Sequence, residues 1–180
     1  NQFSHYSNLE EQKEVFEIRK AGLNILMSMK GNKKPVAFIE DCAVSLDHLA
    51  DYTAQLKEIF KKYNTSGMFY AHASVGTLHI RPVLNMKSDE DIKNMRSISE
   101  ESFEIVKNYK GSHSGEHGDG IVRSEFHEMM FGKKIVNAFE EIKDTFDSKN
   151  LLNPGKIVRP LKSNDRSLMR YKPGYQTQNI

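Results

Sequence analysis

The order of helical and strand-like patterns along the chain limits its possible folds more than any other feature. Apolar residues recur at helical spacing in four segments, expected at about 9–29, 45–63, from 88 onward and from 124 onward. Between them lie short runs suited to strands, at 36–39, 68–72 and 77–84. The wholly apolar run 36–39 suits a central strand, and the other two runs flank a small-residue turn and predict a hairpin. This order predicts an α+β domain with antiparallel strands and helices packed on one face of the sheet.

Individual residues indicate where these elements begin, end or break. Ser45, Ser88 and Ser124 are expected to cap the last three helices, because a serine oxygen can accept a free backbone N–H. Gly132 predicts a weak point or break in the fourth helix. Pro82 cannot donate to a β-ladder, so its end of the strand is expected to be an edge or a bulge. The first helix is expected to carry one apolar stripe, formed by Val15, Ile18, Ile25, Leu26 and Met29.

Composition excludes several classes of function. Lysine and arginine total 26 against 24 acidic residues, and the basic residues are dispersed, so nucleic-acid binding is not expected. The single cysteine, Cys42, excludes an internal disulfide and is expected to be a small buried residue rather than a nucleophile. No stretch approaches the roughly 20 apolar residues of a membrane span, and no signal peptide opens the chain.

The two ends of the chain lead to further expectations. The chain begins at Asn1 without an initiator methionine, so we expect it to be part of a longer protein. After about Pro160 the helical and strand patterns stop, and residues 162–180 are polar. We therefore expect one domain over residues 1–160 and an extended tail or linker over 161–180.

Two histidines in the predicted hairpin are candidates for metal binding. If the hairpin turns symmetrically about Val75 and Gly76, His72 lies opposite His79, with Cβ atoms roughly 5 Å apart. Two imidazoles held in this way could bind one divalent ion. The same register places Tyr70 opposite Arg81, which would give a polar strand face that a ligand pocket could satisfy. The alternative is that both histidines lie on a solvated face.

A second candidate site is the glycine-rich segment 111–120, which carries Glu116 and His117 between its glycines. Glycines permit backbone conformations closed to other residues and a close approach to a ligand. A carboxylate and an imidazole in such a loop suit a metal ligand and a general base. The segment lacks the strand and helix context of a dinucleotide-binding fingerprint. A flexible surface turn is the alternative, and the later sequence 153–155, Asn-Pro-Gly, predicts a turn directly after the last helix.

Taken together and in this order, these segments resemble the C-terminal domain of FAD-linked oxidases of the vanillyl-alcohol-oxidase type. That group includes D-lactate dehydrogenases, glycolate oxidase subunits and D-2-hydroxyglutarate dehydrogenases. The resemblance extends from about Arg19 to Ile157 and rests on the His72–His79 hairpin, the loop 114–118 and the turn 152–156. The stretches 34–41, 78–82 and 118–124 resemble the branch in which the flavin part is fused to a C-terminal iron–sulfur region.

The resemblance implies roles for six residues. His72, His79 and Glu116 would bind a divalent metal, commonly zinc, which holds the substrate carboxylate and 2-hydroxyl. His117 would be the catalytic base that takes the hydroxyl proton while hydride passes to the flavin. Arg19 would meet the substrate carboxylate, and Asn153 would lie close to the flavin. Relatives usually have Gly-His at the first histidine and Gly-Asn before Leu-His, where this chain has Ala71 and Thr77, so the resemblance does not specify the hydroxyacid.

The resemblance also implies cofactors and partners that this chain does not supply by itself. FAD would be held mainly by an FAD-binding domain of the same parent chain, and an iron–sulfur cluster would lie elsewhere in the parent. The substrate would be a D-2-hydroxyacid of the lactate, glycolate or 2-hydroxyglutarate type, and the location cytoplasmic or membrane-peripheral. The chain alone is expected to be inactive. Two alternatives remain: a self-contained zinc-dependent hydrolase that uses the same residues with His117 as its base, and a non-catalytic binding module whose loops only pack against a partner domain.

Overall fold

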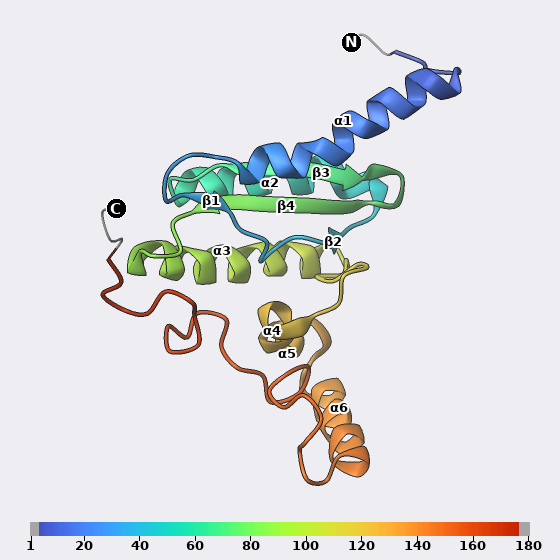
Figure 1. Cartoon of the computed structure of the whole chain (residues 1–180). Coiled ribbons are helices and arrows are strands. Elements are labelled where there is room, and N and C mark those ends of the chain that lie inside the picture. The colour runs from blue at the N-terminus through green and yellow to red at the C-terminus, as the bar shows by residue number, and fades with distance from the viewer. Residues whose placement is uncertain (1–3, 177–180) are drawn as a thin grey trace.

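The computed structural model describes residues 4–176, apart from the side chain of Leu23, and shows a mixed helical and antiparallel structure (Figure 1). The helices are α1 (Leu9–Met27), α2 (Leu49–Lys62), α3 (Asp89–Asn108), α4 (Gly120–Arg123), α5 (His127–Phe131) and α6 (Lys133–Phe146). The strands are β1 (Lys34–Pro35), β2 (Cys42–Ala43), β3 (Gly67–His72) and β4 (Thr77–Leu84). The α+β class expected from the sequence is confirmed. None of the described helices is long and apolar enough to cross a bilayer.

Strand β4 lies at the centre of the sheet. It pairs with β3 on one side and with β1 and β2, at its two ends, on the other. The expectation that Pro82 marks an edge is therefore wrong, because β4 pairs on both sides. The alternative of a bulge stays a prediction, since residues 36–41, between β1 and β2, form a loop. Six residues separate Pro35 from Cys42, whereas only four separate their partners Val83 and Leu78. The longer segment must leave the ladder beside Pro82.

The apolar run 36–39, expected as a central strand, forms no strand. It belongs to the longer segment between β1 and β2, and the chain then turns through Asp41, whose φ is 72°. Phe38 and Ile39 are nevertheless buried, with 2% and 0% of their surface exposed. Hydrophobicity therefore predicts the burial of Phe38 and Ile39 correctly, but neither the exposure of Ala37 nor the backbone conformation of the run.

The predicted hairpin is present, but its register differs by two residues from the expected one. A short 3₁₀ turn closed by Gly76, whose φ is 74°, places the centre of the turn one residue earlier. The facing pairs are His72 with Thr77, Tyr70 with His79, and Met68 with Arg81. The expected pairs of His72 with His79 and of Tyr70 with Arg81 are wrong. Because a shift of two residues preserves the face of a strand, His72 and His79 still project to the same side as diagonal neighbours.

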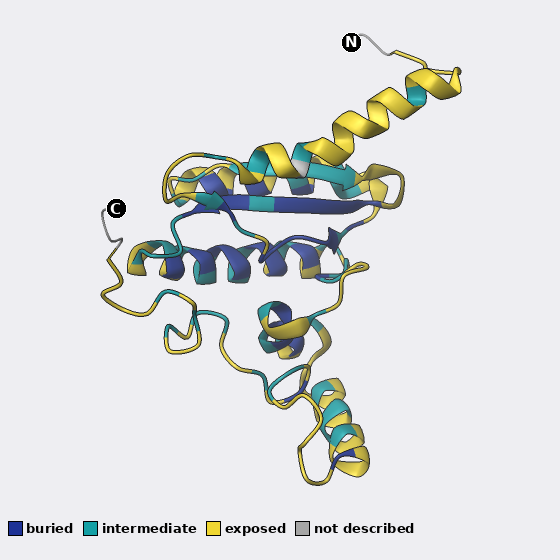
Figure 2. Cartoon of the chain, in the orientation of Figure 1, coloured by how far each residue is buried: buried dark blue, intermediate teal, exposed yellow. Residues whose placement is uncertain are grey.

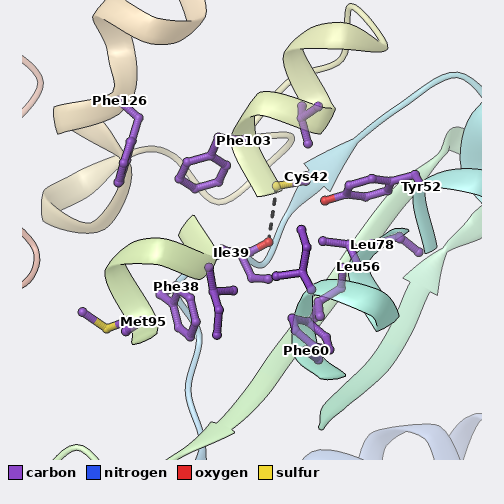
Figure 3. Close-up of a cluster of buried hydrophobic side chains, with 14 of the residues drawn as sticks. Phe38, Ile39, Cys42, Tyr52, Leu56, Phe60, Leu78, Met95, Phe103 and Phe126 are labelled. Carbon is purple, nitrogen blue, oxygen red and sulfur yellow. Dashed lines mark hydrogen bonds between the residues drawn. The ribbon is translucent and has the colours of Figure 1, made fainter. Parts of the chain in front are cut away.

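The core lies between the sheet and helices α2 and α3, which also contact each other (Figure 3). It is formed by Leu78, Ile80 and Leu84 of β4, by Tyr52, Leu56, Ile59 and Phe60 of α2, and by Met95, Ile98, Phe103 and Val106 of α3. Cys42 is buried in this core, where its thiol donates to the carbonyl of Ile39 at 3.3 Å. Burial raises the pKa of this thiol to about 12, so Cys42 is the neutral core residue that its sequence context predicts.

Helix α1 begins where the sequence predicts, and the side chain of Asn8 caps it by accepting from the backbone N–H of Glu10 at 2.8 Å. Most of the helix is exposed (Figure 2). In its apolar stripe, Val15, Ile18 and Ile25 expose 45%, 73% and 65% of their surface. The N-terminal half of the helix extends away from the sheet (Figure 1). Helical periodicity therefore identifies α1, but residues 4–176 do not cover its apolar face.

The three predicted serine caps have different outcomes. Ser88 caps α3 and accepts from the backbone N–H of Asp91 at 3.4 Å. Ser45 precedes a 3₁₀ turn at the start of α2 and makes no capping hydrogen bond through its side chain. Ser124 lies after α4, where its hydroxyl donates to the carbonyl of Gly120. The cap at Ser124 is wrong because helical structure has already begun at Gly120.

The fourth predicted helix is divided, and the chain after it folds back. Gly132, with a φ of 81°, separates α5 from α6, as its sequence position predicts. Residues 147–176 contain turns without a helix or strand. The chain then returns towards α3 (Figure 1), where Arg166 forms an ion pair with Asp89 at 2.6 Å. The last four residues of the expected tail lie outside the described part of the chain, and the domain boundary at residue 160 stays a prediction.

Candidate metal centre

Three histidines and one glutamate converge beside the hairpin. His72 and His79 come from β3 and β4, whereas Glu116 and His117 come from the loop between α3 and α4. The Nε2 atoms of His72 and His79 each lie 3.2 Å from Oε1 of Glu116. Nε2 of His117 lies 3.7 Å from the same oxygen. The structure thus brings together four of the six residues that the sequence singles out.

His79 forms the buried part of this cluster. Only 4% of its side chain is exposed, whereas the side chains of His72, Glu116 and His117 are about half exposed. Burial lowers the pKa of His79 and outweighs the opposing charge of the nearby Glu40 carboxylate. His79 is therefore a neutral imidazole at pH 7, which is the form that binds a metal ion. Its buried Nδ1 has no hydrogen-bond partner among the described residues.

The donor atoms of the cluster fit a divalent metal ion. Two imidazole nitrogens and one carboxylate oxygen are a donor set used at catalytic zinc sites, where a fourth position stays open. Ligand distances of about 2.0–2.1 Å in a tetrahedral site place donor atoms about 3.3 Å from one another, close to the 3.2 Å that separates Oε1 of Glu116 from Nε2 of His72 and from Nε2 of His79. His72 is not part of the group whose donor atoms all lie within 4.8 Å of one another, so it would have to move to complete such a site. His117 and Asp41 also offer donor atoms that lie within 4.8 Å of those of His79 and Glu116. The geometry therefore admits His117 either as a further ligand or as a neighbouring base.

Asp41 anchors the loop that carries Glu116 and His117, and sequence reasoning did not select it. Its Oδ2 accepts hydrogen bonds from the backbone N–H groups of Glu116 and His117, both at 2.8 Å, and its carbonyl accepts from Gly115 at 2.7 Å. Burial opposes ionisation, but the N–H groups of His117 and Glu116 together lower the pKa of this carboxyl. A Cβ atom at Gly115 would lie 3.1 Å from the Asp41 carbonyl oxygen, so a glycine suits this close approach.

Glu40 contacts the ring of His117, and sequence reasoning did not select it either. Its Oε1 accepts a hydrogen bond from Nδ1 of His117 at 2.8 Å, and its Oε2 lies 3.2 Å from the guanidinium of Arg81. Because a carboxylate only accepts, Nδ1 carries the proton and Nε2 of a neutral His117 presents its lone pair. The available sequence signal was an acidic pair directly after an apolar run, within the stretch 34–41 on which the resemblance partly rests.

Arg19 lies outside the histidine cluster, on a neighbouring surface. It is exposed on α1 and lines a cavity of about 470 Å³ together with Phe69 and Tyr70 of β3. The ring centroid of Tyr70 lies 5.1 Å from that of His79. Tyr70 therefore lines the cavity and also contacts the histidine cluster.

Asn153 lies on a different part of the molecule. It adopts a φ of 49° in the turn after α6 and lines a cavity of about 410 Å³ with Phe139, Ile142 and Phe146 of that helix. Phe146 is 83% exposed, so this cavity opens onto an apolar surface. The structure does not bring Asn153 to the histidines, and its expected position beside a flavin stays a prediction.

Comparison with known proteins shows a consistent set of relatives. A family model described as the C-terminal domain of FAD linked oxidases matches residues 1–157. A D-2-hydroxyglutarate dehydrogenase of Haemophilus influenzae is 36% identical over 159 residues, which cover 88% of this chain and 15% of the relative. The glycolate oxidase subunit GlcD of Bacillus subtilis is 29% identical over 148 residues, which cover 82% of this chain and 31% of the relative. The chain therefore spans less than a third of the length of either relative.

Proposed function

The chain belongs to the family of C-terminal domains of FAD-linked oxidases, and we propose that it forms the substrate- and metal-binding part of a flavin-dependent enzyme that oxidises a D-2-hydroxyacid. The observation that carries this proposal is the convergence of His72, His79 and His117 on one oxygen of Glu116. The substrate class is supported by the relatives, which are named as D-2-hydroxyglutarate dehydrogenases, a glycolate oxidase subunit and D-lactate dehydrogenases.

His72, His79 and Glu116 would hold a divalent ion, and zinc suits this mixed nitrogen and oxygen donor set. When bound, the ion would act as a Lewis acid that lowers the pKa of the 2-hydroxyl group of the substrate, and it would orient the carboxylate of the substrate. His79 would hold the ion from the buried side, because it is the least exposed of the three. The half-exposed His72 and Glu116 would border the side that substrate enters.

His117 would be the catalytic base. Its Nδ1–H is engaged by Glu40, which leaves the Nε2 lone pair on the side of Glu116, where the 2-hydroxyl of a bound substrate would lie. His117 would take the hydroxyl proton as the hydride leaves the carbon that bears this hydroxyl group. Glu40 would hold the imidazole in this orientation and stabilise the imidazolium that forms. The flavin, bound mainly by another part of the parent protein, would accept the hydride.

Arg19 would contribute to binding the substrate carboxylate, for which a bidentate guanidinium is suited. Its position beside Tyr70 supports this role, because Tyr70 contacts His79 of the proposed metal site. Asn153 would face the flavin from the apolar surface beside α6. An iron–sulfur cluster, where the parent protein has one, would lie outside this chain.

The proposal is tested on the parent protein that carries this chain. We expect at least one equivalent of zinc or manganese by mass spectrometry, together with oxidation of D-lactate or D-2-hydroxyglutarate when an artificial electron acceptor is present. A His72→Ala/His79→Ala variant should lose the catalytic metal and turnover, whereas His48→Ala, a histidine outside the cluster, should lose neither. Full hydroxyacid oxidation by the double variant would overturn the proposal.

The two alternatives predict different results in the same experiment. A self-contained zinc hydrolase would act without flavin, whereas we expect the isolated chain to have no turnover. A non-catalytic binding module would leave the activity of the parent protein unchanged in a His79→Ala variant. We expect this variant to be strongly impaired, because His79 is the buried ligand of the proposed site.

A further inference from the structure

A second group of potential metal ligands lies outside the site described above. It consists of His113 and Asp119, from the loop between α3 and α4, and His127, the first residue of α5. Nε2 of His127 lies 3.3 Å from Oδ2 of Asp119, and Nε2 of His113 lies 3.6 Å from Oδ1. Both histidines are buried, with 0% and 2% of the surface of His113 and His127 exposed. The loop and the helix thus meet through three groups able to bind a cation.

Hydrogen bonds within the protein do not satisfy these groups. Nδ1 of His127 lies 3.1 Å from the carbonyl oxygen of Ile157, and a carbonyl only accepts, so Nδ1 carries the proton. Nε2 of a neutral His127 then presents its lone pair to a carboxylate oxygen of Asp119. Two electron-rich atoms that face each other in a buried site repel unless a cation lies between them.

His113 is only partly satisfied. Its ring has one backbone contact, with Arg123, but no side chain of the described residues forms a hydrogen bond with either of its nitrogens, and Oδ1 of Asp119 also lacks a partner there. Burial lowers the pKa of His113 to about 4 and outweighs the opposing effect of the Asp119 carboxylate.

The separations between the donor atoms match those around a metal ion. Distances of 3.3 and 3.6 Å are close to the roughly 3.3 Å between ligand atoms of a tetrahedral zinc site. Aromatic rings lie next to the group. The ring centroid of Phe131 lies 5.6 Å from that of His113 and 5.4 Å from that of His127, and the ring centroid of Phe103 lies 5.4 Å from that of His113. These apolar rings lower the polarity around the group and so strengthen the attraction between a cation and the carboxylate.

We propose that His113, Asp119 and His127 bind a second divalent ion of the zinc class. Three protein ligands leave one position for a water molecule or for the second oxygen of Asp119. The role of this ion is structural, because its ligands are largely buried and it joins the loop that carries Glu116 and His117 to α5. Through the contact of His127 with Ile157, it also joins this loop to the segment after α6.

The test separates the two sites by removing the first one. In the full chain carrying His72→Ala/His79→Ala, we expect one equivalent of zinc by mass spectrometry after dialysis, and cobalt(II) should give the visible absorption of a low-symmetry site. Adding Asp119→Asn or His127→Gln should abolish both signals. In the same background, His48→Gln should leave both unchanged, because His48 lies outside the two groups. Far-UV circular dichroism checks that each variant is folded.

Thermal unfolding provides a readout that does not depend on the folding of the ligand variants. Zinc should raise the Tm of the His72→Ala/His79→Ala chain, and a chelator should reverse the rise. An unchanged Tm together with no bound zinc or cobalt would overturn the proposal, as would full zinc binding by a folded Asp119→Asn variant. If only the first site is misassigned, the His72→Ala/His79→Ala variant will bind as much metal as the unsubstituted chain. Adding Asp119→Asn to that variant will still abolish its zinc binding.

Discussion

Oε1 of Glu40 accepts a hydrogen bond from Nδ1 of His117 at 2.8 Å, and this contact joins a turn of the sheet to the glycine-rich loop. The two residues are 77 positions apart in the chain. Glu40 is buried, with 7% of its surface exposed, so the imidazole has a fixed partner on one side and the proposed site on the other. Carboxylates commonly accept from one ring nitrogen of a histidine in this way and so orient the other nitrogen towards a metal ion or a substrate.

Glu40→Gln should separate the positioning of His117 from metal binding. The amide is isosteric but uncharged, so it stabilises an imidazolium less well and allows the other ring orientation. We expect kcat of the parent enzyme to fall roughly 10–100-fold, part of the ~10²–10⁴ that a general base contributes. Metal content and KM should change little. A loss of metal as large as that in His72→Ala/His79→Ala would instead place Glu40 in the metal-binding set.

Asp41→Asn should destabilise the protein without straining the backbone. Asparagine tolerates the positive φ of 72° at this position, but its neutral oxygen accepts more weakly from the N–H groups of Glu116 and His117. We expect a loss of about 1–3 kcal/mol in the free energy of unfolding, measured by urea denaturation. Amide exchange at Glu116 and His117 should also accelerate. Unchanged exchange at these two amides would contradict the anchoring role of Asp41.

Gly76→Ala and Gly31→Ala form a matched pair, because both glycines have a positive φ, 74° and 92°. A Cβ at Gly76 would lie 1.9 Å from the carbonyl oxygen of Val44, whereas no atom lies within 4 Å of a Cβ at Gly31. The Gly31 variant should cost about 1–2 kcal/mol through its backbone conformation alone. Gly76→Ala should cost roughly 1–3 kcal/mol more, by overpacking. Equal urea unfolding midpoints for the Gly76→Ala and Gly31→Ala variants would show that the hairpin turn adjusts to the added methyl group.

Asp147 should make the turn before Asn153 sensitive to acid. The ammonium of Lys143 and the backbone N–H groups of Leu152 and Leu151 lower the pKa of this carboxyl from 3.8 to about 2. Because the folded pKa lies below the unfolded one, this stabilisation is complete above pH 3.8 and is lost as the pH falls towards 2.

The free energy of unfolding, measured in urea between pH 2 and 5, checks the role of Asp147. Asp147→Asn should flatten the decrease at low pH, since asparagine has no proton to gain. Asp51→Asn, which removes an exposed carboxylate on α2, serves as the control and should leave the decrease as it is. A decrease as steep in Asp147→Asn as in the unsubstituted chain would show that other carboxyl groups dominate.

Part of the site could be predicted even though one of its pairings was wrong. To predict that His72 and His79 share a face, it was enough to assign the two strands and to know the register of their pairing to within two residues, because side chains alternate between the two faces of a strand. Their direct pairing needed the centre of the turn, which depends on how the 3₁₀ turn and Gly76 fit against Val44. An error of two residues in the register therefore left the candidate ligands together.

Glu40 and Asp41 could not be predicted in the same way. Their segment has the composition of a buried strand, and its local pattern gives no reason to leave the ladder. It leaves the ladder because it is two residues longer than the stretch of β4 between its two pairing sites. That comparison requires knowing which residues of β4 pair with Pro35 and Cys42, which is tertiary information.

The sequence by itself determined the helices, the hairpin, the family and the residue types of the proposed site. These follow from local periodicity, turn residues and motifs, each of which acts over a few positions. Only the tertiary structure decided which groups meet: Glu40 with His117, Asp41 with the loop amides, and His113 with Asp119 and His127. Such contacts join segments that are distant in the chain, and they depend on the burial of the core, which holds those segments at fixed positions in space.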